Sequence, residues 1–194
     1  ADGDFTAAAL TLVEDGKAVH FPLSNGTQGV RGMAISPDGR YLAVAHVLSR
    51  YQVPTTQLDR GWMNTNAVTV IDTDEPDKPH PVLLDDPDAG AANPWGVSFS
   101  GDGGKLFVTH AGTHELSVID FPALLERMKR EGRGNEPVSE RLGFLHGLRT
   151  RIALPLNGPR SVASDGKNVY GAGYFSDSLA EVSLKDACKS RAIP

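Results

Sequence analysis

Apolar residues recur at alternate positions in short runs along most of the chain, and turn-forming residues separate the runs. This period of two is typical of β-strands. Three segments, 29–46, 93–110 and 157–174, share one pattern: an apolar run, a turn with an Asp-Gly pair, and a second run that ends in small residues. An Asp-Gly pair between such runs is a strong hairpin signal, because a type I′ turn needs positive φ angles. The pattern therefore predicts three β-hairpins.

Further strands are expected after each hairpin. Third strands are predicted at 67–72, 115–120 and 179–184, and outer, fourth strands at 81–84 and 150–154. Four antiparallel strands in one unit form the blade of a β-propeller.

The two ends of the chain are predicted to hold partial blades. Segments 6–13 and 17–22 match the third and fourth strands of a preceding blade, and no fourth strand is expected after Leu184. The predicted fold is all-β, a β-propeller of four-stranded antiparallel blades, here an incomplete arc of about three blades. Because closed propellers typically have about 4–8 blades and an open arc exposes sheet edges, the chain is expected to be part of a larger propeller. A small four-bladed ring or a compact β-sandwich is the alternative.

The whole chain, 1–194, is predicted to be a single propeller region with two insertions. Equivalent serines, Ser36, Ser100 and Ser164, are 64 residues apart, against roughly 40–50 residues in common propeller repeats. In the second insertion, residues 122–130 have the pattern of a short amphipathic helix with proline in its first turn. The predicted units are the end of a preceding blade (1–28), a blade with an inserted loop at 47–66 (29–92), a blade with a helical insertion at 122–149 (93–156), and an incomplete blade (157–194).

Composition and charge exclude several classes of protein and of site. Gly and Pro together make up 34 of 194 residues, an excess that fits many turns. The net charge is −5 with no basic stripe, so nucleic acid is excluded as a partner. No apolar stretch approaches the roughly 20 residues of a transmembrane helix. The single cysteine, Cys188, cannot form an internal disulfide or complete a C-x-x-C-H haem attachment.

Two parts of the sequence resemble a known family. Ser-Pro-Asp-Gly-Arg-Tyr-Leu-Ala-Val-Ala at 36–45, followed by Asn-Ala-Val-Thr-Val-Ile-Asp at 66–72, resembles the YVTN-type bacterial β-propeller repeat. Segments 50–66 and 171–178 look like stretches of exported bacterial propellers that are joined to cytochrome c or di-haem-peroxidase-like domains. The resemblance implies a periplasmic or secreted protein, and it places the haem-binding motifs downstream of the propeller. No haem is expected to be covalently bound in this chain, whereas a haem c in a downstream domain or partner agrees with the resemblance.

The inserted loop is the first candidate site, because a rigid sheet positions long loops for function. Arg50 and Arg60 could hold an anionic group, Asp59 could orient a guanidinium, and Trp62 could supply an apolar surface. The alternative is an Ω-loop whose polar side chains cap its own backbone. The candidate binding residues are Arg50, Gln52, Thr55, Thr56, Gln57, Asp59, Arg60, Trp62 and Asn64.

Two histidines form the second candidate site. His46 and His110 occupy equivalent repeat positions at the end of a strand. Such positions in neighbouring blades can converge near one end of a propeller channel, which makes a shared metal conceivable. Neutral imidazoles also serve as buried hydrogen-bonding groups, so a structural role is the alternative.

Two functions follow from these patterns. The first is a non-catalytic propeller scaffold or binding module of an exported bacterial protein, associated with a c-type cytochrome or di-haem-peroxidase-like electron-transfer unit. Its expected partners are a haem-containing domain or subunit and the remaining blades of the same propeller. The alternative is a propeller enzyme of the lactonase or quinoprotein-like type with a metal at the axial channel.

Overall fold

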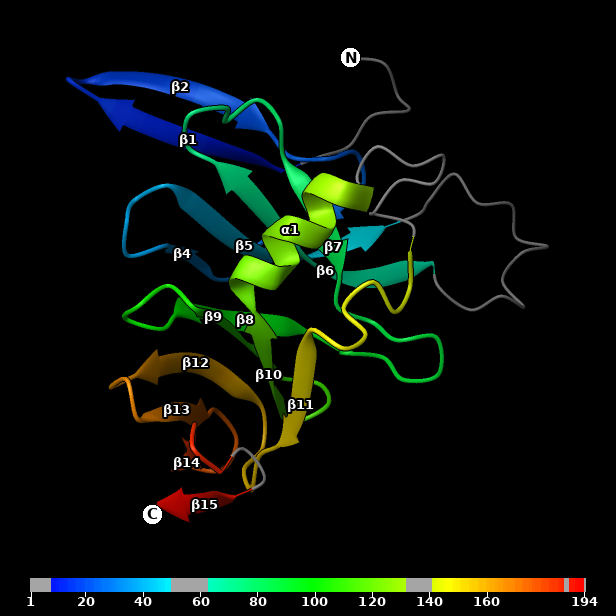
Figure 1. Ribbon diagram of the computed structural model, residues 1–194, viewed down its shortest axis with the longest axis vertical. Helices are drawn as coiled ribbons and strands as arrows, with labels where there is room; N and C mark the ends of the chain where they lie inside the picture. Colours follow the sequence, from blue (N-terminus) through cyan, green and yellow to red (C-terminus); the bar gives the residue numbers. More distant parts are fainter. Residues whose placement is uncertain (1–7, 50–62, 132–140, 187–188, 194) are drawn as a thin grey trace.

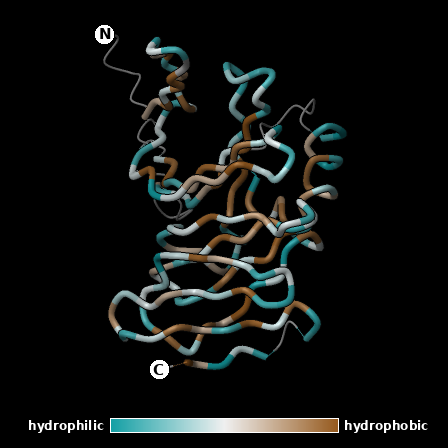
Figure 2. The backbone as a smooth tube through the Cα atoms, turned by 90° about the vertical axis from the view of Figure 1, so that its left-hand side faces the viewer, coloured by the Kyte–Doolittle hydropathy of each residue, from teal (hydrophilic) through white to brown (hydrophobic). Residues whose placement is uncertain are grey.

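A computed structural model of the chain describes residues 8–49, 63–131, 141–186 and 189–193 (Figure 1). The described residues form four antiparallel sheets stacked along the long axis, as the tube in Figure 2 also shows. The first sheet contains β1 (Ala9–Glu14) and β2 (Lys17–Pro22). The second contains β3 (Thr27–Gln28), β4 (Met33–Ile35), β5 (Tyr41–Ser49), β6 (Asn64–Asp72) and β7 (His80–Leu83).

The third and fourth sheets each have four strands in sequential order. The third contains β8 (Pro94–Phe99), β9 (Lys105–His110), β10 (Glu115–Asp120) and β11 (Arg149–Ala153). The fourth contains β12 (Pro159–Ser164), β13 (Asn168–Gly173), β14 (Ser178–Ser183) and β15 (Ser190–Ile193). Four-stranded antiparallel sheets that follow one another along the chain confirm the predicted all-β propeller arc.

The structure corrects two of the predicted boundaries. The fourth sheet is complete in strand number, because β15 pairs with β14 from Leu179↔Ile193 to Val182↔Ser190. The inserted loop is also shorter than 47–66, because β5 and β6 remain paired out to Ser49↔Asn64. Both strands therefore carry the sheet further toward the loop than the apolar pattern indicated.

The predicted helix is present as α1 (Phe121–Glu131). Asp120 caps its first turn, since its Oδ1 accepts a hydrogen bond of 3.1 Å from the backbone N–H of Ala123. The helix buries Phe121 and Leu124 against the second and third sheets. Phe121 makes edge-to-face contacts with Tyr41 and with Phe99, at ring-centroid distances of 5.5 and 4.9 Å.

The core lies between successive sheets, as in a propeller. One cluster joins the second sheet to the third and includes Val68, Val70, Leu106 and Val108. A second joins the third sheet to the fourth through Phe107, Leu116, Ile152, Val169, Ala180 and Val182. Alternation places these side chains on opposite faces of the third sheet, so that sheet is covered on both faces.

The first strands of successive sheets pack closely because glycine stands where they meet. A Cβ on Gly32 would overlap the backbone oxygen of Trp95. A Cβ on Gly96 would come within 2.9 Å of the Thr109 hydroxyl and 3.0 Å of the Ser161 Cα. The missing side chains therefore allow backbone to pack against backbone along the line where the blades converge.

The first sheet contains only β1 and β2 in the described chain, and part of the neighbouring face stays uncovered. Met33 pairs with Val44 and Ile35 with Leu42, so these residues share the face that contacts Leu10 of β1. Met33 is nevertheless 65% exposed and Ile35 58% exposed. Apolar surface is thus open where two inner strands of the first blade would lie.

Candidate functional site

The sheets have two chemically different ends. In the second, third and fourth sheets, the hairpin turns at 36–40, 100–105 and 165–168 lie at one end, on the left in Figure 1, and we call this the turn end. The strands β4, β8 and β12 begin at the opposite end, which we call the arginine end.

Three equivalent residues stand at the arginine end. Strands β8 and β12 are both six residues long and begin with proline, so Trp95 and Arg160 are their second residues. In the second sheet the equivalent position is Arg31, whose N–H donates to the Ala45 carbonyl at 3.0 Å. The pairing of β8 and of β12 is irregular at this position, between Pro94 and Val97 and between Pro159 and Ser161.

The three side chains stack on one another. The guanidinium carbons of Arg31 and Arg160 each lie 4.2 Å from the centre of the Trp95 ring. Arg160 also lies 3.6 Å from the ring centre of Tyr174 and 5.2 Å from that of Phe175. These distances are those of cation–π contacts. We call these five residues the arginine–aromatic cluster.

Two backbone hydrogen bonds position the aromatic pair just after β13. The N–H of Tyr174 donates to the Gly158 carbonyl at 3.0 Å, and the N–H of Phe175 donates to Asn157 at 3.2 Å. Tyr174 is 61% exposed and Phe175 is 68% exposed, although large apolar rings are usually covered. Hydrogen bonds thus fix the backbone of Tyr174 and Phe175, while both rings remain exposed to solvent.

The two positive charges of the cluster have no carboxylate partner in the described part of the chain. Among the described residues, neither Arg31 nor Arg160 forms an ion pair, and the Nε atom of Arg160 is buried without a hydrogen-bond partner. The two guanidinium carbons are at most about 8 Å apart, because both lie near the same ring centre. At that distance two like charges repel each other, although water around the exposed Arg31 screens most of this repulsion. A bound anion would relieve this repulsion.

The other arginines that the structure describes each form an ion pair. Arg149, with a side chain only 3% exposed, donates to Asp86 and to the carbonyl of Leu84. Arg151 donates to Glu115 at 2.5 Å and to Asp86 at 3.2 Å. These bonds fasten the segment between β7 and β8 onto β11, so their role is structural.

The two histidines proposed as metal ligands are fully buried within their sheets. Nδ1 of His46 faces the Val47 carbonyl at 3.1 Å, so it carries the proton and donates, while Nε2 accepts from the Thr69 hydroxyl at 2.6 Å. Nδ1 of His110 donates to Ala91 at 3.0 Å, and its Nε2 accepts from Ser117 at 2.7 Å. Neither ring has a nitrogen left for a metal.

Burial keeps both histidines neutral. It lowers the pKa of His46, and it lowers the pKa of His110 to about 3, with a further contribution from the charge of Arg149. Over the parts of the chain that the structure describes, no three His, Cys, Asp or Glu side chains gather in a group that could hold a metal ion.

Most of the predicted loop site, from Arg50 to Trp62, lies outside the described residues. Its last member, Asn64, is exposed and accepts a hydrogen bond of 2.5 Å from the Ser49 hydroxyl. Ser49 ends β5 and its N–H donates to the Gly26 carbonyl at 2.8 Å, at the arginine end. Both strands that flank the loop therefore meet it at the same end as the cluster.

The sequence alignment did not reveal the cluster, because one hairpin turn differs in length from its equivalent and shifts the alignment. Matching Ser164 with Ser100 places Pro159 opposite Trp95. The turn between β12 and β13 is shorter than the turn between β8 and β9, so the true equivalent of Trp95 is Arg160. Aligning the Pro94 and Pro159 positions instead would have revealed the match.

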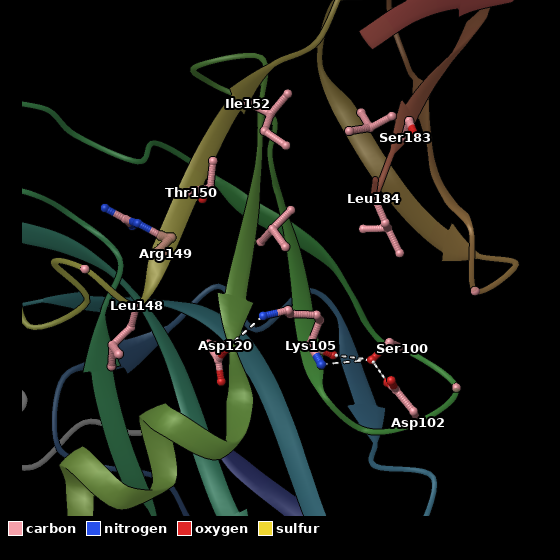
Figure 3. Close-up of a pocket in the computed structure, with 15 residues that line it drawn as sticks. Ser100, Asp102, Lys105, Asp120, Leu148, Arg149, Thr150, Ile152, Ser183 and Leu184 are labelled. Carbon is pink, nitrogen blue, oxygen red and sulfur yellow. Dashed lines mark hydrogen bonds and ion pairs between the residues drawn. The ribbon is translucent and has the colours of Figure 1, made fainter. Parts of the chain in front are cut away.

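A groove at the turn end has a different character. It lies between the third and fourth sheets, with a volume of about 970 Å³ (Figure 3). Lys105 donates to Asp120 at 2.8 Å, and the Ser100 hydroxyl donates to Asp102 at 2.6 Å. Lys105, Asp120 and Asp102 thus already have partners on the wall of the groove. They offer less to a ligand than Arg31 and Arg160, which form no ion pair with the described residues.

Solved structures place the chain among propeller-like β proteins, and no family model matches it. Streptogramin B lyase aligns over 96% of this chain and 48% of its own, with 10% identity and a TM-score of 0.59. A nidogen/laminin complex aligns over 92% of this chain and 52% of its own, with 18% identity and a TM-score of 0.57. At such identities these likenesses concern the fold.

A more specific similarity is to one enzyme assembly. Hydrazine synthase subunit beta of Kuenenia stuttgartiensis is 28% identical over 183 residues, which cover 92% of this chain and 46% of that protein. A solved hydrazine synthase structure from the same organism aligns over 91% of this chain and 55% of its own, with 24% identity and a TM-score of 0.75. The chain thus spans about half the length of these relatives. No helix in the described residues is long and apolar enough to cross a membrane.

Proposed function

We propose that this chain is a non-catalytic β-propeller module that binds a partner subunit of a larger enzyme complex through its arginine end. The observation that carries the proposal is the arginine–aromatic cluster, in which two arginines without an ion pair among the described residues meet two exposed rings at the ends of three successive sheets. Exposed Tyr, Trp and Arg side chains dominate the binding energy of many protein interfaces. The similarity to a hydrazine synthase beta subunit supports a role as one part of an assembly.

The partner we propose is a c-type cytochrome or a di-haem-peroxidase-like unit, in which the redox chemistry takes place. The sequence resemblance to exported propellers supports this choice of partner. The same resemblance supports a periplasmic or secreted location. The inserted loop, with Arg50, Arg60 and Trp62, would contribute to the same surface, because its flanking strands meet it at the arginine end.

The remaining blades of the propeller would complete the ring. The open apolar face at Met33 and Ile35 supports this proposal, because two further strands beside β1 would cover it. These strands would come from additional chain, as the greater length of the relatives suggests.

A propeller enzyme with an axial metal is less well supported. His46 and His110 were its candidate ligands, and each uses both ring nitrogens within its own sheet. The geometry therefore favours the binding module.

The test is co-elution of the intact protein, purified from its source, with a haem-containing subunit. Absorbance at the Soret band of haem and at 280 nm would be followed through size exclusion. We expect joint elution with the natural chain and separation with the charge reversals R31E and R160E. R40E is the matched control, because Arg40 stacks over Tyr41 at the turn end and is paired with Asp72. Elution free of haem for the natural protein would contradict the proposal.

A further inference from the structure

We propose that Arg31 and Arg160 form a carboxylate-binding site, and that its ligand is an acidic peptide segment of the partner subunit. The inference deepens the proposed function, on which the identity of the partner rests. The binding of carboxylates by this chain can be tested on its own.

The charge of the cluster differs from that of the chain around it. The chain as a whole is acidic, with a net charge of −5, yet two cations lie together here without a carboxylate among the described residues. The seven other described arginines each contact Asp or Glu: Arg40, Arg127, Arg130, Arg141, Arg149, Arg151 and Arg191. The positive charge at the arginine end is therefore available to a ligand.

The geometry of the two guanidinium groups suits carboxylates. A guanidinium has five donors in a planar fork, which matches the two oxygens of a carboxylate. The indole of Trp95 contacts the faces of both guanidinium groups, and no described residue accepts a hydrogen bond from either group. Because Nε of Arg160 is buried, the outer N–H groups of that side chain are the ones that could donate to a ligand. Two guanidinium groups on one indole ring favour a ligand with two or more carboxylates in succession, such as adjacent acidic side chains of an extended segment.

Two aromatic rings form an apolar border beside the arginines. Phe175 and Tyr174 flank Arg160 and are largely exposed. Apolar groups of a bound peptide could cover these rings, and the covered rings would exclude water from the ion pairs. Exclusion of water strengthens an ion pair relative to one on an open surface.

Trp95 also supplies the readout. The chain has two tryptophans, so the single substitution W62F leaves the indole between the two arginines as the only one. Hexaglutamate is titrated into this protein at low salt, and the fluorescence of Trp95 is followed. Calorimetric titration of the natural chain with the same probe measures whether W62F itself changes the affinity. We expect a saturable change, weakened at least about tenfold by R31Q or R160Q, abolished by both together, and weakened as NaCl rises.

The matched control is R40Q, which removes an arginine stacked on an aromatic ring at the turn end. Hexaglutamate should bind that variant with unchanged affinity. A second arm compares haemin with its dimethyl ester, because a haem propionate is another source of carboxylate. Binding of haemin that is lost in the ester and in the double variant supports the carboxylate site with a porphyrin as its source.

Three results would overturn the proposal: no saturable change with either probe, equal binding by the R31Q/R160Q variant, or equal loss in R40Q. Circular dichroism of each variant checks that the fold is intact. If hexaglutamate binds as expected but no haem subunit co-elutes with the intact protein, the site stands and the proposed partner is wrong. If a haem subunit co-elutes although hexaglutamate does not bind, the proposed function stands and the carboxylate site does not.

Discussion

The turn end and the arginine end differ in where their polar groups find partners. At the turn end, the polar side chains of each hairpin form hydrogen bonds within the same hairpin. The Ser36 hydroxyl donates to Asp38 at 2.5 Å, and Ser100 donates to Asp102 at 2.6 Å. These hydrogen bonds hold the pKa of Asp38 and of Asp102 below the usual range. At the arginine end, Arg31 and Arg160 stack on aromatic rings, and neither forms an ion pair with any residue that the structure describes. The contrast separates polar residues that build the fold from polar residues that remain available for binding.

The largest difference between the ends should come from adding a methyl group. In G96A the new Cβ would press on Thr109 and Ser161, and we expect a loss of about 3 kcal/mol in the free energy of unfolding. G101A is the control, because nothing lies within 4 Å of a Cβ at Gly101 in the turn end. Its effect should stay within about 0.5 kcal/mol. Urea denaturation measures both, and equal midpoints would mean that backbone contact at Gly96 is not needed.

The pH dependence should also distinguish the two ends. The folded state holds the pKa of His110 at about 3, below its ordinary value of 6.5. Between pH 6.5 and pH 3, His110 is therefore protonated in the unfolded chain but neutral in the folded chain. The free energy of unfolding falls as the pH drops below 6.5. The loss is about 1.4 kcal/mol per pH unit, or about 2 kcal/mol by pH 5.

The carboxylates of Asp38 and Asp102 affect stability at lower pH than His110 does. Because their pKa values are lowered from 3.8, their contribution is present above that pH and is lost only in stronger acid. Urea titrations at pH 7 and pH 5, for the natural chain and for H110N, measure the difference. A slope that H110N leaves unchanged between pH 7 and 5 would show that His110 is not responsible.

A smaller effect is expected for S100A at the turn end. The Ser100 hydroxyl is buried, donates to Asp102, and accepts from the N–H of Lys105 at 2.8 Å. Its removal should lower the free energy of unfolding by about 1 kcal/mol. Partner co-elution should be unchanged, and weaker co-elution by a folded S100A protein would place the turn end in the interface.

The smallest effect on stability is expected for R31Q, although it should weaken binding. Arg31 is exposed and has no ion pair among the described residues, so its loss should change the free energy of unfolding by no more than about 0.5 kcal/mol. Thermal or urea unfolding measures this change. A loss of 2 kcal/mol or more would assign Arg31 to the fold rather than to a binding site.

The sequence predicted strands best where apolar residues alternate without interruption. The predicted third strand at 115–120 coincides with β10, and the predicted helix lies within α1. Strand β15 was missed because Ser190–Ile193 has few apolar residues, and its pairing rests on backbone bonds and on Arg191, which donates to Glu181 at 2.6 Å. Contacts of this kind, between an edge strand and its neighbour, leave little trace in hydrophobic periodicity.

The candidate site was harder to predict than the fold. Whether an arginine is paired depends on residues distant in sequence: Arg149 meets Asp86, whereas Arg160 meets Trp95. No local pattern distinguishes these two arginines. Likewise, the hydrogen-bond partners of His46 and His110 come from the adjacent strand or loop, and they became identifiable only with the strand register. The role predicted for Arg50 to Trp62 stays a prediction.

The irregular pairing at Trp95 and Arg160 has an evolutionary consequence. An extra residue in one strand is left out of the ladder, and its side chain is freed from the alternation that assigns its neighbours to the core. Residues on either side must still fit between two sheets, but this position can change its chemistry without repacking them. The chain itself places Arg, Trp and Arg at the equivalent positions of three successive blades. Each further blade of a complete ring would offer one more such position, so new binding specificities could arise by single substitutions on a constant scaffold.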